Sequence, residues 1–322
     1  MSSIIFRGMF ALACLVVAPA FAQTYPSKAV RIIVPFPPGG PTDVVGRLVA
    51  TKLGEALNQQ FVVENRAGAG GTVGSEVVAQ APADGYTLLY GSTSTLAMAP
   101  SLYRKLGYDP RKSFAPISLV SSGPLLVAVN AAVPAQTLTQ LIALAKEKPG
   151  TLNYGSAGNA TPPHLAAELF KSLSATDLTH VPYKGGAPAL QAIAAGEVQV
   201  IFEGIVTLLP QIKAGRLRAL AITGTARDAS LPEVPTVAEA GLPAFQVNFW
   251  SGLVAPAGTP PEVVGVLNAA LRRALAAPDA RETLTKFGLA PAGNTPVEFA
   301  RFIDGEIIRW ERAVQASGAK VD

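Results

Sequence analysis

Cysteine, histidine and long apolar runs are scarce in this chain, and each scarcity excludes a class of function. Cys14 is the only cysteine, and it lies in the N-terminal segment that we expect to be removed on export, so we expect no disulfide, no thiolate nucleophile and no cysteine-ligated metal in the mature chain. His164 and His180 are the only histidines, and neither has a second histidine or a cysteine at helical or turn spacing. The sequence therefore predicts no metal site and no metal cofactor.

Charged residues are also few, at 15% of the chain, with 26 Lys and Arg against 22 Asp and Glu. This small positive balance includes no basic run, so nucleic acid and anionic membranes are not expected as main partners. No apolar run reaches the ~20 residues that a membrane-spanning helix needs. A hydrophobic content of 49% allows large buried cores. A chain of 322 residues predicts two domains of roughly 150 residues each.

Residues 1–22 have the pattern of a cleavable export signal. Arg7 precedes an apolar run at residues 9–17, and a small-x-small pattern ends at Ala22. We therefore expect cleavage near Ala22 and an exported mature protein. A lipoprotein signal at Cys14 is the alternative, but its leucine stands one place too late and the apolar run continues past the cysteine.

Beyond this segment the chain repeats one plan: a short β-rich run, a loop of Gly, Ser or Pro, and then apolar residues at helical spacing. The strands expected from this plan lie at residues 30–34, 60–64, 86–91, 125–130, 153–155, 179–183, 198–203 and 217–223. Such alternation predicts an α/β fold in which helices cover parallel sheets.

Three threonines are predicted to begin helices. Thr259 and Thr295 each precede a proline and have a glutamate three residues later, the pattern of a capping box with Pro in the first turn. Thr137 has Gln140 at the same spacing. The last two helices carry apolar stripes that predict core faces. These stripes are Val263, Leu267, Leu271, Leu275, Phe299, Ile303, Trp310 and Val314.

Loops that lead from strands into helices are the candidate binding elements, because free N–H groups and the helix dipole there favour an anion. They lie at residues 35–43, 66–71, 92–95, 156–164 and 182–187. The first lacks the lysine of a nucleotide-binding P-loop. The second places Gly74 one residue too late for a dinucleotide motif, and no acidic residue ends the next strand. A nucleotide cofactor is therefore not expected.

Asp43 and His164 each allow a structural and a functional interpretation. Asp43 is the third residue of the helix that Gly40 would cap, where a carboxylate stabilises the helix start; alternatively it contacts a ligand amine, hydroxyl or water. His164 is the third residue of the helix that Thr161 would cap, where a neutral ring packs; alternatively it contacts the ligand. Ser156 lies in the same unit, so a Ser–His pair is conceivable, although no Gly-x-Ser-x-Gly elbow is present.

Tyr183, Trp250 and Glu203 are further candidates. Aromatic residues are more often core than pocket wall, but a glycine loop follows Tyr183, which favours contact with a ligand. Glu203 ends a strand ahead of a helix. If Glu203 faces a cleft, it would repel an anion and select a ligand that carries a hydrogen-bond donor.

Five motifs occur in order along the chain: VRIIVPFPPGGPTD, VVENRAGAGGTVG, NYGSAGNATPPHLAAELF, VPYKGGAPALQAIAAGEV and WSGLVAPAGTPPEVV. With them the chain closely resembles the Bug family of periplasmic solute-binding proteins, the extracytoplasmic receptors of tripartite tricarboxylate transporters. The match covers essentially all of the mature chain. The resemblance implies a periplasmic location and a periplasmic-binding-protein type II-like (Venus flytrap) fold, with two α/β domains, the ligand in the cleft between them and no chemistry performed on it.

The resemblance also implies domains, a ligand class and partners. Residues 23–122 and 241–322 would form the first domain, and residues 123–240 the second. The ligand would be a small carboxylate, such as a dicarboxylate, a tricarboxylate, an acidic amino acid or an aromatic acid. The receptor would be a monomer without catalytic residues or cofactors, and the permease subunits of a tripartite tricarboxylate transporter would be its partners.

In this family, loops from both domains hold a ligand carboxylate through backbone groups, hydroxyls and bound waters. Carried over to matching positions, the resemblance implies ligand contacts at Phe36, Pro38, Gly39, Gly40, Asp43, Ser92, Thr93, Ser156, Gly158, Asn159, Thr161, His164 and Tyr183. Glu203 departs from the family, which commonly has Asp at this place. Its side chain is one methylene longer than that of Asp, so the identity of the ligand cannot be inferred from a relative that has Asp at this position.

Two other functions stay open. A secreted α/β enzyme that acts on a small carboxylate would use His164 or Asp43 as general base. A ligand-sensing receptor would present its closed form to a signalling partner instead of a permease.

Overall fold

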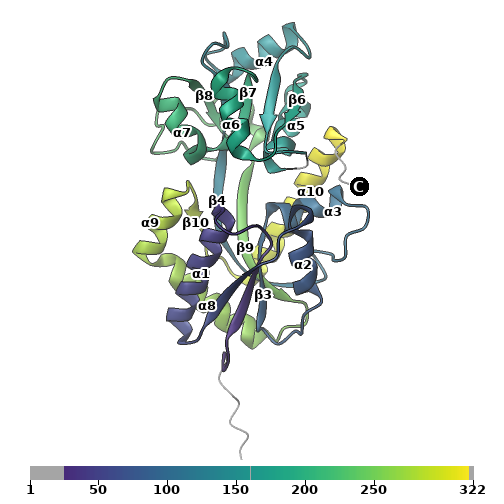
Figure 1. The fold of residues 1–322 in the computed structure, drawn as a ribbon, viewed down its shortest axis with the longest axis vertical. Coiled ribbons are helices and arrows are strands. Elements are labelled where there is room, and N and C mark those ends of the chain that lie inside the picture. The colour runs from purple at the N-terminus through teal and green to yellow at the C-terminus, as the bar shows by residue number, and fades with distance from the viewer. Residues whose placement is uncertain (1–24, 160, 319–322) are drawn as a thin grey trace, which may run out of the picture.

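The computed structural model describes residues 25–159 and 161–318. The expected export signal, residues 1–22, lies outside these ranges. No helix in the described part of the chain is long and apolar enough to cross a membrane. Figure 1 shows the elements in two lobes, one above the other, with β4 (Phe114–Asn130) and β9 (Asn248–Pro256) running between them.

The lower lobe in Figure 1, here called the first lobe, is built on strands in the order β2-β1-β3-β9-β4. β1 (Val30–Val34), β2 (Phe61–Asn65) and β3 (Thr87–Ser92) run parallel, as the alternation of strands and helices predicts. β9 is antiparallel to both β3 and β4. The short β10 (Ala290–Pro291) pairs with β4.

Helices cover both faces of this first sheet. They are α1 (Pro41–Leu57), α2 (Thr72–Ala79), α3 (Ala99–Leu102), α8 (Pro261–Ala276) and α9 (Pro278–Lys286), with short turns of 3-10 and π helix at Ala69–Gly71 and Ser94–Met98. On one face, Val45 and Leu53 of α1 share a core with Leu267 and Leu271 of α8. On the other, Val78 of α2 is buried with Leu89 of β3.

The upper lobe, here called the second lobe, has strands in the order β4-β7-β5-β6, and β8 pairs with the other edge of β4. The strands are β5 (Asn153–Ser156), β6 (Thr179–Pro182), β7 (Val200–Gly204) and β8 (Leu217–Ile222). The helices are α4 (Leu138–Glu147), α5 (Pro162–Ser174), α6 (Gly186–Ala195) and α7 (Ile205–Lys213). β4 therefore belongs to both lobes.

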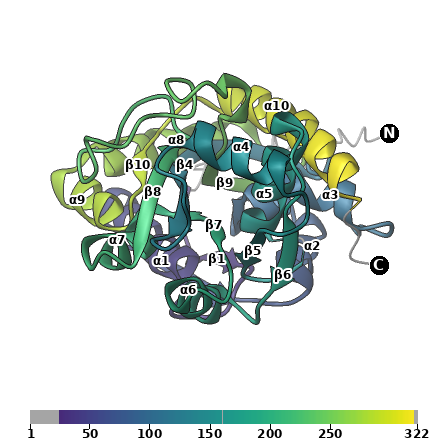
Figure 2. The same cartoon turned by 90° about the horizontal axis from the view of Figure 1, so that it is seen from above.

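Alternate residues of β4 divide these helices between two faces. Leu125 and Val127 pack with residues of α4 and α5, whereas Leu126 and Ala128 pack with residues of α6 and α7. Figure 2 shows the result from above, with α4 and α5 on one side of the lobe and α6 on the opposite side.

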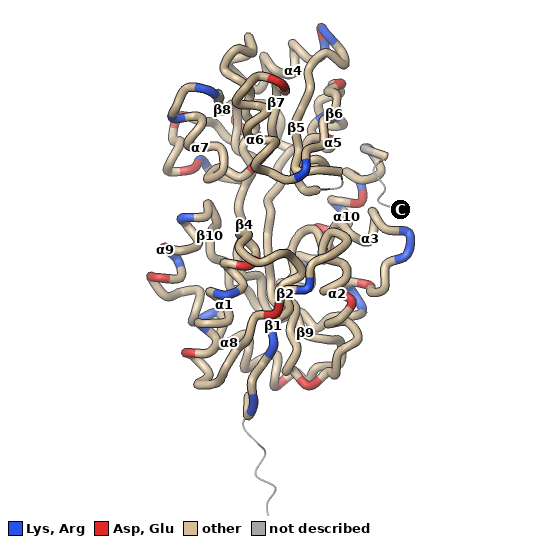
Figure 3. Tube along the Cα trace, viewed as in Figure 1, with Lys and Arg blue, Asp and Glu red and all other residues tan. Residues whose placement is uncertain are grey.

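Charged residues are spread over both lobes. Figure 3 shows Lys and Arg interspersed with Asp and Glu, without a large region of one sign. This distribution matches the small positive balance of the sequence. Ion pairs such as Lys112–Asp109 and Lys286–Glu282 join exposed side chains, so each contributes roughly 0–1 kcal/mol.

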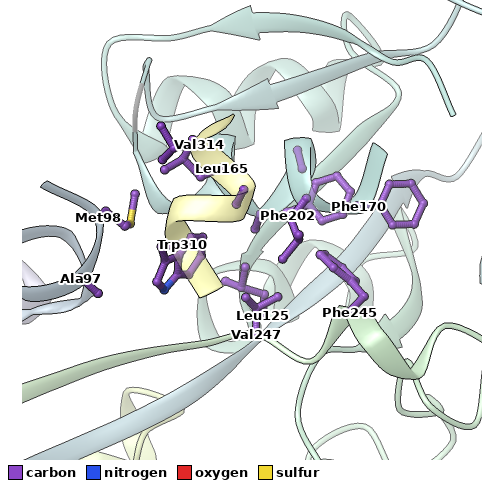
Figure 4. Close-up of a cluster of buried hydrophobic side chains, with 14 of the residues drawn as sticks. Ala97, Met98, Leu125, Leu165, Phe170, Phe202, Phe245, Val247, Trp310 and Val314 are labelled. Atoms are coloured by element: carbon purple, nitrogen blue, oxygen red, sulfur yellow. The ribbon is translucent and has the colours of Figure 1, made fainter. Parts of the chain in front are cut away.

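The last helix, α10 (Pro296–Ser317), runs from the first lobe to the second (Figure 1). Phe299 packs edge-on against Trp250 of β9. Further along, Trp310 and Val314 lie beside Leu165 of α5 in one buried cluster (Figure 4). The core stripe predicted for this helix is confirmed. Through this stripe, α10 packs against residues of both lobes.

The helix starts test the capping predictions. Thr295 forms the predicted capping box with Glu298, and Thr137 caps α4. The capping box predicted at Thr259 is wrong. Pro261 holds Pro260 in an extended conformation, so α8 starts at Pro261, one residue later than expected. The Thr259 hydroxyl instead donates to a backbone carbonyl of the preceding turn, 2.8 Å away.

The strand expected at residues 125–130 is the second half of a longer strand. β4 begins at Phe114 and contains Pro116 and Pro124, although proline is rare in central strands. Its register with β9 shifts after Pro116, and its pairing passes from β9 to β7 after Pro124. The prolines thus stand where the ladder is interrupted.

Candidate functional site

A cavity of about 350 Å³ lies between the two lobes. Phe36, Thr42 and Ser92 line it from the first lobe, and Glu203 and Ile205 line it from the second. The position agrees with the rule that ligands of α/β sheets bind beyond strand ends, where loops enter helices.

A larger hollow of about 890 Å³ lies on the second lobe alone. It is bounded by the start of α4, by β8 and by residues 233–241. None of the loops predicted to bind an anion reaches it. The cavity between the lobes is therefore the stronger candidate site.

Aromatic side chains make much of the cavity wall. Phe36, Phe249 and Phe287 are partly buried there, and Trp250 is buried. Trp250 is held from behind by α10, because its Nε1 donates to Glu306 Oε2 over 2.8 Å. Its ring also meets two phenylalanines of that helix edge-on. Such a wall suits the apolar body of a small ligand.

Polar groups gather where β3 ends. Ser92 lines the cavity, and its Oγ is buried with no hydrogen-bond partner in the described part of the chain. An unpaired buried hydroxyl costs roughly 1–3 kcal/mol, so such groups normally have a partner. Thr93 differs, because its Oγ1 accepts from Trp250 N over 2.9 Å. Ser92 is thus the hydroxyl that a bound molecule would satisfy.

A chain of hydroxyls adjoins Ser92. Tyr90 OH lies 2.6 Å from Ser251 Oγ, which lies 3.1 Å from Ser121 Oγ, and all three residues line the cavity. Burial raises the pKa of Tyr90 above its ordinary value. These three hydroxyl groups are therefore uncharged. They can orient a polar group of the ligand by hydrogen bonding, but they cannot neutralise a second negative charge on it.

Asp43 holds the loop that precedes α1. Its side chain is 4% exposed; Oδ2 accepts from Gly39 N (2.9 Å) and Arg47 Nε (3.0 Å), and Oδ1 accepts from Asn65 Nδ2 (2.8 Å). The hydrogen bond from Arg47 is the main cause that lowers the pKa of Asp43 to about 2. The structural interpretation of Asp43 is observed, whereas its contact with a ligand stays a prediction.

The loop after β5 is held largely by its own hydroxyls. Ser156 Oγ accepts from Gly158 N (3.1 Å) and lies 2.6 Å from His180 Nε2, while Thr161 Oγ1 donates to Gly158 O (2.7 Å). Ser156 thus pairs with His180 rather than with His164, because parallel pairing of β5 and β6 sets His180 beside β5.

The two histidines stack on each other, with 4.1 Å between ring centroids, and His180 stacks in turn on Tyr154. Burial lowers the pKa of His164, and burial together with His164 lowers the pKa of His180 to about 4. Both rings are therefore neutral at neutral pH. This packing agrees with the structural interpretation of His164.

Glu203 faces the cavity at the end of β7. Its Oε1 accepts from Gly204 N over 2.9 Å. Burial raises the pKa of Glu203, and the hydrogen bond from Gly204 opposes that shift. None of the described residues that line the cavity is Lys, Arg or His. Glu203 thus places a carboxyl group in the cavity, and the described part of the wall offers it no cationic partner.

Of the predicted ligand contacts, Phe36, Ser92, Thr93 and Glu203 line the cavity. The others lie in or beside the loops that border it before α1 and after β5. They are Pro38, Gly39, Gly40, Asp43, Ser156, Gly158, Asn159, Thr161, His164 and Tyr183. For these residues, ligand contact stays a prediction.

Several wall residues were missed by the sequence analysis. Tyr90 lies two positions before Ser92 on β3, so strand alternation puts both on one face and could have identified it. Ser251 is paired with Ser92 in the ladder of β3 and β9, which no local pattern reveals. Phe287 and Leu289 follow α9 and carry no motif.

Comparisons with known proteins identify close relatives. The family model described as tripartite tricarboxylate transporter family receptor matches residues 45–319. Protein BugT of Bordetella pertussis is 38% identical over 315 residues, which cover 98% of this chain and 97% of BugT.

Solved structures of relatives share the fold. The structure of Rpa4515 from R. palustris with adipate is 36% identical, with a TM-score of 0.80, and the match covers 92% of this chain and 100% of that one. MatC from Rhodopseudomonas palustris with bound malate is 38% identical, with a TM-score of 0.76 and coverage of 90% and 100%.

These relatives confirm the resemblance to the Bug family and the Venus-flytrap α/β fold that it implies. They also match the observed architecture, in which two lobes enclose a cavity lined from both sides. The chain is a periplasmic solute-binding receptor, and it belongs to the family of tripartite tricarboxylate transporter receptors.

Proposed function

We propose that this receptor binds a small carboxylate between its lobes and delivers it to the permease subunits of a tripartite tricarboxylate-type transporter. The observation that carries the ligand class is Ser92 Oγ, a buried donor in the cavity wall without a partner in the described part of the chain. A carboxylate oxygen accepts such a bond, and charge-assisted hydrogen bonds are about twice as strong as neutral ones. Adipate and malate in the structures of two relatives support this class.

Closure of the lobes would complete the site. β4 and β9 run between the lobes and form the proposed hinge, with residues 23–122 and 241–322 on one side and residues 123–240 on the other. In the closed form the loop after β5 and Tyr183 would approach the ligand from the second lobe, opposite Gly39 and Gly40 of the first.

The same geometry favours binding without chemistry. Asp43 accepts three hydrogen bonds and has a pKa of about 2, which makes it a weak base. His164 is stacked against His180. Neither Asp43 nor His164 lines the cavity, so the two general bases considered from the sequence are poorly placed to act on a bound carboxylate.

We propose as well that residues 1–22 are removed on export near Ala22 and that the mature receptor is a monomer. Intact-mass spectrometry of the protein from the periplasm measures the cleavage site. Light scattering with and without ligand measures the oligomeric state.

A thermal-shift screen of mono-, di-, tri- and aromatic carboxylates tests the ligand class. A ligand at about 100 times its Kd raises the free energy of unfolding by about 2.7 kcal/mol. If no carboxylate raises the Tm while nucleotides or metal cations do, the proposal fails. Uptake of the ligand by cells with and without this receptor then distinguishes transport from signalling, because deletion of a signalling receptor leaves uptake unchanged.

A further inference from the structure

Glu203 is the only acidic or basic residue among the described residues that line the cavity. It stands on the second lobe at the end of β7. Ser92 and the hydroxyl chain of Tyr90 and Ser251 belong to the first lobe. The cavity thus has hydroxyl donors on one lobe, a carboxyl group on the other, and aromatic side chains in the wall.

We propose that Glu203 determines the ligand class, so that the cavity accepts monocarboxylates with an apolar body and an uncharged far end and rejects dicarboxylates. The inference rests on the proposed carboxylate binding. In this arrangement the ligand carboxylate accepts a hydrogen bond from Ser92, and the uncharged end of the ligand lies against Glu203.

The carboxyl group of Glu203 is fixed in place. Gly204 N–H donates to Oε1 over 2.9 Å. Oε2 accepts no hydrogen bond within residues 25–159 and 161–318, and the start of α6 approaches it, since a Cβ at Gly186 would stand 3.8 Å away. One oxygen of Glu203 is therefore left to meet a ligand.

Among the residues that the structure describes, no charged group compensates Glu203. Its partner on β4 is Leu126, Gly204 follows it on β7, and Gly186 at the start of α6 approaches it; none of these residues titrates. Burial raises the pKa of Glu203, and no described ionisable group contributes to the shift.

The protonation state of Glu203 determines why a dicarboxylate binds weakly. An ionised Glu203 repels the second carboxylate, and no Lys, Arg or His among the described wall residues offsets the repulsion. A protonated Glu203 can donate to a hydroxyl or carbonyl group of the ligand, but it can meet a carboxylate only while the pair shares a proton. Dicarboxylate binding therefore requires a proton shared by the two carboxyl groups and should weaken as the pH rises, whereas monocarboxylate binding does not require that proton.

Isothermal titration calorimetry with matched acids tests the inference. Hexanoate and adipate have the same carbon chain and differ in the second carboxylate, and benzoate and terephthalate form an aromatic pair. At about pH 8 each monocarboxylate should bind at least about tenfold more tightly than its dicarboxylate partner. The difference should narrow at about pH 6.

Glu203→Gln is the informative variant, because an amide oxygen can still accept from Gly204 N–H while the charge is removed. Its discrimination between hexanoate and adipate should fall below about threefold, with hexanoate affinity retained. Glu197→Gln removes one negative charge from an exposed position of the same lobe and is the matched control. It should discriminate as the wild type does.

Three outcomes overturn the inference. Equal or tighter binding of adipate by the wild type at about pH 8 contradicts it, while carboxylate binding itself stands. Full discrimination by a Glu203→Gln protein with an unchanged Tm assigns the selectivity to another residue. Failure of every carboxylate to bind removes the proposed function and the inference together.

Discussion

Replacing Asp43 by asparagine tests how the loop before α1 is held. In the wild type, Gly39 N and Arg47 Nε donate to Oδ2, and Asn65 Nδ2 donates to Oδ1. Asparagine offers a single oxygen, so at least one of these donors must face an NH₂ group. Asn65 cannot turn its amide without a loss, because its Oδ1 accepts from Arg47 Nη2 over 3.0 Å.

The size of the effect follows from two estimates. The fall of the Asp43 pKa from 3.8 to about 2 corresponds to roughly 2 kcal/mol. The Arg47 side chain is 53% exposed, so solvent reduces its part of that figure. A buried donor left without an acceptor costs roughly 1–3 kcal/mol. We therefore expect Asp43→Asn to lower the free energy of unfolding by about 1–2 kcal/mol at neutral pH and to leave carboxylate affinity unchanged.

The loss should depend on pH in one direction. Because folding lowers the pKa of Asp43, its stabilisation is complete above the unfolded value of 3.8 and disappears as the pH falls through about 2. Urea unfolding of both proteins from neutral pH downward measures the difference, with the exposed Asp177→Asn as control. Equal stabilities at neutral pH, or a difference that persists at the acid limit, would refute the reasoning.

Three further substitutions test ligand binding or stability at separate positions. Ser92→Ala removes an unpaired buried hydroxyl, so unfolding in urea should be unchanged or slightly harder while calorimetry shows roughly tenfold weaker carboxylate binding. Gly40→Val should fold normally, since the nearest atom to a Cβ there is 3.9 Å away. It should abolish binding, because the side chain blocks the approach of the ligand to the backbone. Tight binding by this variant would show that the loop before α1 is not part of the binding site. The neutral His180 should make the wild type lose stability as the pH falls from 6.5 to about 4, because only the unfolded chain takes up a proton in that range. His180→Gln should flatten this part of the urea-unfolding profile, and identical profiles would contradict the burial argument.

Local signals account for the parts of the fold that could be predicted. β1 and α1 lie where the apolar pattern and the glycine cap at Gly40 place them, because a buried strand and a capped helix carry their own information. β4 could not be predicted in full. Pro116 and Pro124 interrupt its local pattern, and partners remote in the sequence hold the strand in place.

The site divides in the same way. The loops that carry Phe36 and Ser92, and the strand end at Glu203, could be predicted because ligands of α/β folds bind beyond strand ends, whereas the family resemblance supplied Phe36 and Ser92 themselves. Phe287 could not be predicted, because it reaches the cavity through a turn after α9 that lies against β4. The approach is so close that a Cβ at Gly123 would stand 2.6 Å from the carbonyl oxygen of Gly288.

Glu306 links the cavity to the contact between the lobes. Its Oε2 accepts from Nε1 of both tryptophans in the chain, Trp250 at 2.8 Å and Trp310 at 3.2 Å. The first bond anchors α10 to β9 of the first lobe, whereas Trp310 packs beside Leu165 of the second (Figure 4). If the proposed closure rotates the lobes about β4 and β9, we expect the hydrogen bond to Trp250 to keep α10 with the first lobe, so that α10 slides over α5. Tryptophan fluorescence should report ligand binding through Trp250, which lines the cavity. It should report the movement of α10 over α5 through Trp310, which lies beside Leu165.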